Sequence, residues 1–258
     1  MLARERHEQI LFELRRRGGV RVTELSTRLG VSDMTIRRDL DALQLEGLVE
    51  KVHGGAVLPG HTADEPGFET KRTREQREKI AIARAAARLV TPGCSIALSA
   101  GTTTWYLAQL LGGISGLTVV TNSTNAALEL HRHGGAQIIL TGGVFRTPSD
   151  ALVGPIADHA VRALHVDLLF LGVHGIDPDA GLTTPNVAEA ETNRMMMSHA
   201  RKVVVVADHT KWRNVGLCSI SPLDVVDVLI VDDGIEDDAR SVLEERVGEL
   251  VVAEREPA

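Results

Sequence analysis

Hydrophobic residues near the start of the chain recur with the spacing of an amphipathic helix. The first apolar stripe consists of Val22, Leu25 and Leu29. These steps of three and four residues predict a short helix over residues 23–29. Gly30 follows it, as glycine commonly does at a helix C-terminus, and Ser32 is a suitable N-cap for a second helix.

The second predicted helix has two distinct faces. Its buried stripe consists of Ile36, Leu40 and Leu43. Its opposite face carries Met34, Arg37, Arg38 and Asp41. Two short helices joined by a tight turn, the second with arginines in its N-terminal half, are typical of a helix-turn-helix that reads the major groove of DNA. A preceding helix completes the small core with Ile10, Leu11 and Leu14.

A hairpin is predicted after this helix. Gly47 ends the helix, and the apolar pairs Leu48-Val49 and Ala56-Val57 flank a turn at Gly54-Gly55, which indicates the wing of a winged helix. We expect one of the adjacent arginines at a base edge and the other at a phosphate. The alternative is a solvated helix with ordinary surface arginines. The candidate DNA-binding residues are Arg21, Thr23, Ser32, Met34, Thr35, Arg37, Arg38, Lys51 and His53.

Residues 58–68, LPGHTADEPGF, are rich in proline, glycine and small polar residues. Such a composition is typical of a linker between domains. The sequence therefore predicts a winged helix-turn-helix domain over residues 1–57, a linker over residues 58–68 and a second domain over residues 69–258.

The second domain alternates helical and strand-like patterns. It should open with one long helix that starts at Glu69 and ends before Pro92. Apolar strand-like runs lie at residues 95–98, 117–120, 137–140, 166–173, 202–207 and 227–232. Helical patterns fill the gaps at about 103–111, 123–132, 155–163, 188–200 and 236–246. Nearly continuous β-branched strands that alternate with helices predict an α/β fold with a parallel sheet covered on both faces.

Polar residues and glycines follow several of these strands. An open parallel sheet binds ligands beyond the carboxyl ends of its strands. Gly101 precedes a helix whose first N–H groups favour an anion, and Lys211 could neutralise a phosphate. The candidate residues for a small phosphorylated molecule are Ser99, Gly101, Thr102, Thr103, Thr104, Asn122, Ser123, Gly142, Gly143, Asp177, Glu189 and Lys211.

Each of these residues also has a purely structural explanation. A threonine or Asn122-Ser123 can simply cap a helix, and Gly142-Gly143 can simply make a turn. Glu189 lies near a predicted helix N-terminus, where the helix dipole favours an acid whatever the function. The convergence of five such loops on one sheet edge favours a pocket for a small phosphorylated polyol or sugar.

A net charge of −7 is unexpected for a protein that binds DNA, so the distribution of charge along the chain matters. Residues 1–60 hold 10 basic and 9 acidic side chains, which leaves 18 basic and 26 acidic side chains for the rest. The acidic excess therefore lies outside the predicted DNA reader. Because a head of near-neutral charge binds DNA weakly, we expect a homodimer or homotetramer that presents two heads.

The two cysteines, Cys94 and Cys218, lie far apart and form no Cys-x-x-Cys motif. No run of about 18 apolar residues indicates a membrane span, and the charged N-terminus does not resemble a signal peptide. We therefore expect a protein of the reducing cytoplasm without a metal site or a cofactor.

The motifs TIRRDL at 35–40 and HGGA at 53–56 resemble the N-terminal domain of the DeoR family of bacterial transcription regulators. Later motifs resemble the sugar-phosphate-sensing domain of that family: GTTT at 101–104, VVTNS at 119–123, LTGG at 140–143, LGVHGID at 171–177 and ADHTK at 207–211. The resemblance implies a repressor of carbohydrate-catabolism genes whose binding to double-stranded operator DNA responds to a phosphorylated sugar or polyol. It also implies a sensor with the fold of sugar-phosphate isomerases.

The chain departs from the family pattern at two places. Many members carry Asp where Ser99 stands, and many carry Lys near Asn193, where this chain offers Arg194. These departures leave room for a ligand other than the common phosphorylated sugars.

Two other function classes deserve comparison. A sugar-phosphate isomerase fused to a DNA-binding head would need a base near the substrate carbon, for which Asp177, Asp179, Glu189 and Asp208 are candidates. The chain lacks the Lys-Gly-Gly that follows an acidic loop in pentose-phosphate isomerases, and a fold does not confer its chemistry. A Rossmann redox sensor would need Gly-x-Gly-x-x-Gly, which the chain also lacks. We therefore expect a regulator and not an enzyme.

Overall fold

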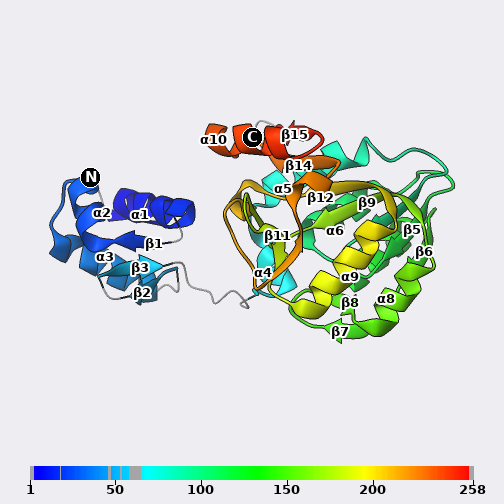
Figure 1. The fold of residues 1–258 in the computed structure, drawn as a ribbon, viewed down its shortest axis with the longest axis horizontal. Coiled ribbons are helices and arrows are strands. Elements are labelled where there is room, and N and C mark those ends of the chain that lie inside the picture. Colours follow the sequence, from blue (N-terminus) through cyan, green and yellow to red (C-terminus); the bar gives the residue numbers. More distant parts are fainter. Residues whose placement is uncertain (1–2, 18, 46–47, 53, 58–64, 256–258) are drawn as a thin grey trace. The chain divides into compact units, whose positions relative to one another are not determined.

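The computed structural model describes residues 3–17, 19–45, 48–52, 54–57 and 65–255. The chain divides into two compact units, Met1–His61 and Thr62–Ala258 (Figure 1). Most of the predicted linker lies outside the described residues, so the linker remains a prediction. Its last residue, Phe68, already belongs to a helix of the second unit. Within the described residues, no helix has both the length and the apolar character needed to cross a bilayer.

The first unit is built from three helices and a small antiparallel sheet. Its elements are α1 (Ala3–Arg17), β1 (Gly19–Arg21), α2 (Val22–Leu29), α3 (Asp33–Leu45), β2 (Glu50–Val52) and β3 (Gly55–Val57). The strands lie in the order β1-β3-β2, so the predicted hairpin is present and pairs with a third strand. The predicted apolar stripes pack into one core of buried side chains, which includes Ile10, Leu14, Val22, Leu25, Ile36, Leu40 and Leu43.

Local signals fix the two turns of this unit. Gly30 ends α2 in the left-handed region with φ of 64°. Ser32 caps α3 as predicted, because its Oγ accepts a hydrogen bond from the backbone N–H of Thr35 at 3.2 Å. In the wing, a Cβ atom on Gly55 would lie 2.0 Å from the carbonyl oxygen of Val20, so only glycine allows β3 to approach β1.

The second unit is an α/β fold around a seven-stranded parallel sheet (Figure 1). Its helices are α4 (Phe68–Thr73), α5 (Gln76–Ala87), α6 (Thr102–Leu110), α7 (Thr124–His133), α8 (Pro155–Arg162), α9 (Val187–Ser198) and α10 (Asp237–Arg246). The sheet strands are β4 (Ser95–Leu98), β5 (Thr118–Thr121), β6 (Gln137–Leu140), β9 (Val166–Gly172), β12 (Ala200–Val206), β14 (Val228–Asp232) and β15 (Leu250–Ala253). They lie in the order β15-β14-β12-β9-β4-β5-β6. The predicted fold class is therefore confirmed.

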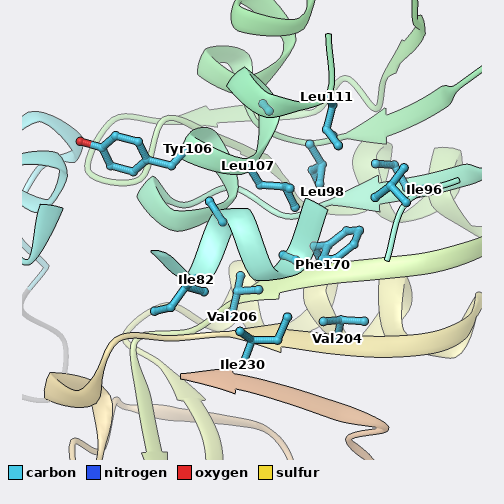
Figure 2. Close-up of a cluster of buried hydrophobic side chains, with 14 of the residues drawn as sticks. Ile82, Ile96, Leu98, Tyr106, Leu107, Leu111, Phe170, Val204, Val206 and Ile230 are labelled. Carbon is cyan, nitrogen blue, oxygen red and sulfur yellow. The ribbon is translucent and has the colours of Figure 1, made fainter. Parts of the chain in front are cut away.

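Helices cover both faces of this sheet because successive residues of its strands point to opposite sides. On one face Ile96, Leu98 and Phe170 pack against α5, α6 and α7, as Figure 2 shows for the strand residues and for Ile82 and Leu107. On the other face Ala97, Leu169 and Leu171 pack in a second cluster with residues of α8, α9 and α10. The short β-branched strands predicted from the sequence therefore form the centre of the unit.

Four features differ from or extend the sequence predictions. The single helix expected from Glu69 is wrong, because the chain breaks into α4 and α5 at Glu75, which has φ of 46°. The edge strand β15 of the main sheet, a small antiparallel sheet, β10-β11-β13, and a hairpin, β7-β8, were not predicted. Their strands are β7 (Val144–Arg146), β8 (Ala151–Val153), β10 (Gly175–Asp177), β11 (Gly181–Thr184) and β13 (Cys218–Ser221), and the short η1 (His209–Lys211) and η2 (Leu223–Val225) complete the unit.

Candidate functional site

The outward face of α3 is the first candidate site. Met34 is 62% exposed, and Arg37, Arg38 and Asp41 are also exposed. Neither arginine forms a salt bridge with another described residue. A helix whose N-terminal half carries free guanidinium groups has the shape and charge required to enter a major groove.

Other basic groups of this unit are bound to acids and hold the unit together. Arg6 of α1 donates to both carboxylate oxygens of the buried Asp39 on α3, at 2.8 and 2.9 Å. Lys51 of the wing contacts Asp41 of α3 at 2.5 Å. These pairs fix α3 against α1 and against the wing.

The remaining predicted DNA contacts lie beside this surface. Arg21 and Thr23 are exposed around the start of α2, and Thr35 is hydrogen-bonded to Ser32 at 2.9 Å between their hydroxyl groups. His53 lies outside the described residues. The assignment of these residues to DNA remains a prediction.

A cavity in the second unit is the second candidate site. It opens beyond the carboxyl ends of β4, β9 and β12. From β4 the chain continues to β5 and β6 on one side, and it then returns to β9 on the other side of β4. The cavity therefore lies at the point where the strand order reverses, which is where open α/β sheets bind ligands. Its lining includes Glu65, Lys71, Lys79, Gly101, Thr102, Thr103, His174, Glu189, Asn193 and Lys211.

The start of α6 forms one wall of this cavity. Gly101, Thr102 and Thr103 line it, so the N-terminus of α6, where the first N–H groups have no partner within the helix, lies at the cavity. Thr104 instead supports the turn, because its hydroxyl donates to the carbonyl oxygens of Ser99 at 2.7 Å and Gly101 at 3.0 Å. This arrangement can hold an anion at the helix N-terminus.

Lysines provide positive charge around the same cavity. Lys79 is only 3% exposed, and its Nζ donates to the carbonyl oxygens of Lys71, at 2.8 Å, and of Arg74. Burial lowers the pKa of Lys79, although Asp208 at 3.8 Å opposes this effect. The same ammonium group therefore caps the C-terminal end of α4 at the point where the predicted long helix is interrupted. Lys211 lies on η1, where Asp208 Oδ1 accepts a hydrogen bond from the backbone N–H of Thr210 at 3.2 Å.

Two carboxylates of the cavity share one arginine. Glu65 contacts Lys71 at 2.6 Å and also Arg146, which lies 3.4 Å from Glu189. Burial raises the pKa of Glu65, but Lys71 and Arg146 outweigh burial and hold it below its usual value. Burial, with the negative charge of Glu65, raises the pKa of Glu189 to about 7. Burial and the nearby Lys211 lower the pKa of His174 to about 4.

The other predicted ligand residues support the cavity and do not line it. Ser99 Oγ accepts from the backbone N–H of Gly172 at 2.9 Å, and Asn122 Oδ1 accepts from that of Ala100 at 2.8 Å. Both contacts position the loop before α6. Ser123 caps α7, and the Asp177 carboxylate accepts from the backbone N–H groups of Asp179 and Ala180 in a turn. Gly142 and Gly143 form the turn after β6 with positive φ angles.

Comparison with known proteins agrees with this geometry. Residues 6–62 match the DeoR-like helix-turn-helix domain, and residues 74–233 match the DeoR C terminal sensor domain. The chain belongs to the DeoR family. It is a DNA-binding transcriptional regulator, and its two units carry the two functional domains of that family.

Named relatives cover nearly the whole of this DeoR-family chain. The HTH-type transcriptional regulator GolR of Listeria innocua is 38% identical over 90% of this chain and 91% of its own length. The glycerol-3-phosphate regulon repressor of Escherichia coli is 32% identical over 88% of this chain and 90% of its own length. Among solved structures, ribose 5-phosphate isomerase A from Methanocaldococcus jannaschii is 17% identical with a TM-score of 0.41, over 55% of this chain and 56% of that chain.

Several cavity residues of this DeoR-family protein were not identified from its sequence. They are the lining residues Glu65, Lys71, Lys79, His174 and Asn193, together with Arg146, which pairs with Glu65. Lys71 and Lys79 stand in a charged helical segment, where solvent exposure is the ordinary expectation. His174 offered a signal, because it lies within the LGVHGID motif directly after a predicted strand. Arg146 and Glu65 are 81 residues apart, so their pairing follows only from the fold.

Proposed function

We propose that this regulator is a repressor of carbohydrate-catabolism genes, and that a small phosphorylated polyol or sugar in the cavity of the second unit controls its binding to operator DNA. The observation that carries the proposal is the meeting of the α6 N-terminus with Lys71, Lys79 and Lys211 at the strand-order reversal. Positive charge and free N–H groups at one place favour a phosphate.

The rest of the cavity suits a hydroxylated carbon chain. Glu189, Asn193 and Thr102 add acceptors and donors beside the lysines. Polar groups of both kinds can bind the hydroxyl groups of a polyol. The name of the Escherichia coli relative, glycerol-3-phosphate regulon repressor, supports an effector of this class.

Assembly and location follow from the same proposal. The exposed face of one α3 reads only a few base pairs, and residues 1–60 carry almost no net charge. A homodimer or homotetramer with two heads doubles the phosphate contacts and reads two half-sites of double-stranded DNA. We place this assembly in the cytoplasm, and we infer that the cavity senses its ligand without catalysing a reaction, in keeping with relatives named as regulators.

A ligand panel tests the proposal. Glycerol 3-phosphate, ribose 5-phosphate and glucosamine 6-phosphate are compared with their unphosphorylated counterparts by thermal unfolding and calorimetric titration. At a concentration 100 times its dissociation constant, a true effector stabilises the fold by about 2.7 kcal/mol. We expect this with at least one phosphorylated compound, and we expect Lys211→Ala to reduce it.

The matched control is Lys202→Ala, because Lys202 lies at the opposite end of β12 from the cavity. That variant should bind the compound like the wild type. Equal stabilisation by phosphorylated and unphosphorylated compounds would contradict the proposal. Turnover of ribose 5-phosphate would show that the cavity is catalytic.

A further inference from the structure

Glu65 is the first residue that the structure describes after the wing, and its carboxylate is held inside the cavity of the second unit. Its side chain is only 5% exposed. Lys71 Nζ donates to it at 2.6 Å, and the Arg146 guanidinium donates to its other oxygen. We call these two ion pairs the Glu65 anchor.

The partners of the anchor are cations that an anionic ligand would also use. Lys71 lines the cavity with Lys79 and Lys211, and Arg146 also contacts Ser149 Oγ at 3.1 Å and Glu189 at 3.4 Å. In this arrangement a carboxylate of the chain itself neutralises positive charge beside the α6 N-terminus. A phosphate that entered the cavity would bring a second negative charge toward Glu65 and would compete for the same donors.

We propose that an anionic effector displaces the Glu65 carboxylate from Lys71 and Arg146, and that this displacement signals occupation of the cavity to the DNA-binding head. This inference rests on the proposed function, because it assigns the regulation of the same cavity.

Because Glu65 directly follows the residues that connect the two units, its displacement can affect the DNA-binding head. Residues 58–64 connect the end of β3 to the anchor. Once the anchor opens, the next buried side chain is Phe68, whose ring packs edge-on against Trp105 with centroids 6.0 Å apart. The connection between head and sensor then gains three residues, which adds about 10 Å to its greatest span.

A longer connection weakens binding to a two-part operator. When one head of a dimer is bound, the effective concentration of the second head at its half-site falls as the connecting chain becomes longer than the span that it must bridge. Effector binding therefore releases DNA. Because such coupling is reciprocal, operator DNA weakens effector binding by the same factor by which the effector weakens operator binding. Loss of the anchor removes the competing carboxylate and therefore strengthens effector binding.

The test compares Glu65→Gln with Glu69→Gln in the full-length protein. Glutamine keeps the shape of the side chain and removes its charge. Glu69 is a matched control, because its side chain is 74% exposed and pairs with Arg72 at 2.7 Å. Calorimetry measures the affinity for inorganic phosphate and glycerol 3-phosphate. Fluorescence anisotropy measures the affinity for an operator fragment located by footprinting with the wild type.

We expect Glu65→Gln to bind the phosphorylated probe at least fivefold more tightly than the wild type, and the operator at least fivefold more weakly, which is the lower end of typical allosteric coupling. Adding the phosphorylated probe should reduce the operator affinity of Glu65→Gln by a smaller factor than it reduces the operator affinity of the wild type. Glu69→Gln should match the wild type in every titration. If Glu65→Gln fails to fold, Glu65→Asp, whose side chain is one methylene shorter, should shift both affinities in the same directions.

The outcomes separate this inference from the proposed function. If the wild type binds neither probe nor any phosphorylated compound of the panel, both the proposed function and the role of the Glu65 anchor are contradicted. A wild type that binds and responds, with a Glu65→Gln variant that behaves identically, overturns the anchor alone. Tighter phosphate binding with unchanged operator binding would show that Glu65 competes with the ligand but does not transmit its presence.

Discussion

At the scale of single residues, Glu65 and Glu189 show how one cavity gives two carboxylates opposite acidities. Glu65 has Lys71 and Arg146 as direct partners, and these cations hold its pKa below its usual value against the effect of burial. Glu189 is also buried, but it only shares Arg146, at 3.4 Å, and it faces the negative charge of Glu65, so its pKa rises to about 7. Near neutral pH a large fraction of Glu189 is therefore a neutral acid, which can donate a hydrogen bond to a ligand oxygen.

This difference predicts a pH dependence of stability. Glu189 has a folded-state pKa of about 7 and a usual value of 4.5, so the folded state binds the proton more tightly than the unfolded state does. Its contribution to the free energy of unfolding is complete below pH 4.5 and is lost as the pH rises to about 7. The loss is on the order of 3 kcal/mol, and Glu189→Gln should abolish it.

Urea unfolding at several pH values measures this effect. The matched control is Glu191→Gln, because Glu191 lies on the same helix but its side chain is 58% exposed and pairs with Arg194 at 3.3 Å. The control should retain the wild-type slope. A Glu189→Gln variant whose stability still falls by the wild-type amount between pH 5 and about 7 would show that another group carries the proton.

The residues of the cavity were predictable only where a glycine or a polar residue directly follows a strand that the sequence pattern reveals. Gly101 and Thr102 follow a recognisable strand and begin a helix, so their place in the wall of the cavity could be inferred. Ser99 and Asn122 have the same kind of position, yet their side chains are used to bond neighbouring backbone. The sequence does not distinguish a side chain that faces a ligand from one that supports the loop beside it.

At the scale of elements, α3 combines a fixed inner face with a free outer face. Its inner side packs into the core of the head and holds Arg6 through Asp39. Its outer side presents Arg37 and Arg38 without a described acidic partner. Because the helix is immobilised from within, little further ordering of its backbone is needed when it enters a groove.

The arginines of α3 are therefore predicted to dominate DNA binding. Replacing the arginine that contacts a base should cost about 1–3 kcal/mol of operator affinity and relax the sequence preference at that base pair. Replacing the arginine that contacts a phosphate should weaken all sequences alike and flatten the dependence on salt. Anisotropy titrations of Arg37→Ala, Arg38→Ala and the double variant at several salt concentrations measure both effects.

Arg4→Ala provides the control, because Arg4 is an exposed arginine of α1 that pairs with Glu8 at 3.3 Å. It should bind the operator nearly as the wild type does. An Arg37→Ala, Arg38→Ala double variant with wild-type affinity and salt dependence would mean that another surface of the head reads the DNA.

The regular elements were largely predictable, whereas their interruptions were not. Six strands of the main sheet were identified as apolar runs without reference to the fold, whereas the edge strand β15 was not predicted. At the break between α4 and α5, the buried Lys79 donates to the carbonyl oxygens of Lys71 and Arg74, a contact that no local sequence pattern indicates. The β10-β11-β13 sheet has strands of only three or four residues, which are too short to show a period.

At the scale of the whole molecule, the helix-turn-helix and the cavity lie in different units. The first carries ten basic side chains within residues 1–60, and the second carries the acidic excess and the cavity. An effector can change operator affinity only if it binds two arrangements of the protein with different affinity. If the cavity controls the head in this way, mutations can alter ligand binding and DNA binding separately.

An operator titration of the double variant Thr102→Ala, Lys211→Ala tests this requirement most directly. Both residues line the cavity and neither belongs to the head. The phosphorylated compound that stabilises the wild type should weaken wild-type operator binding by about 5- to 150-fold. The double variant should bind the operator as the wild type does without ligand and should not respond to the compound. A folded double variant that loses operator binding, or that responds normally, would contradict the account, as would a wild type that responds only to unphosphorylated sugars.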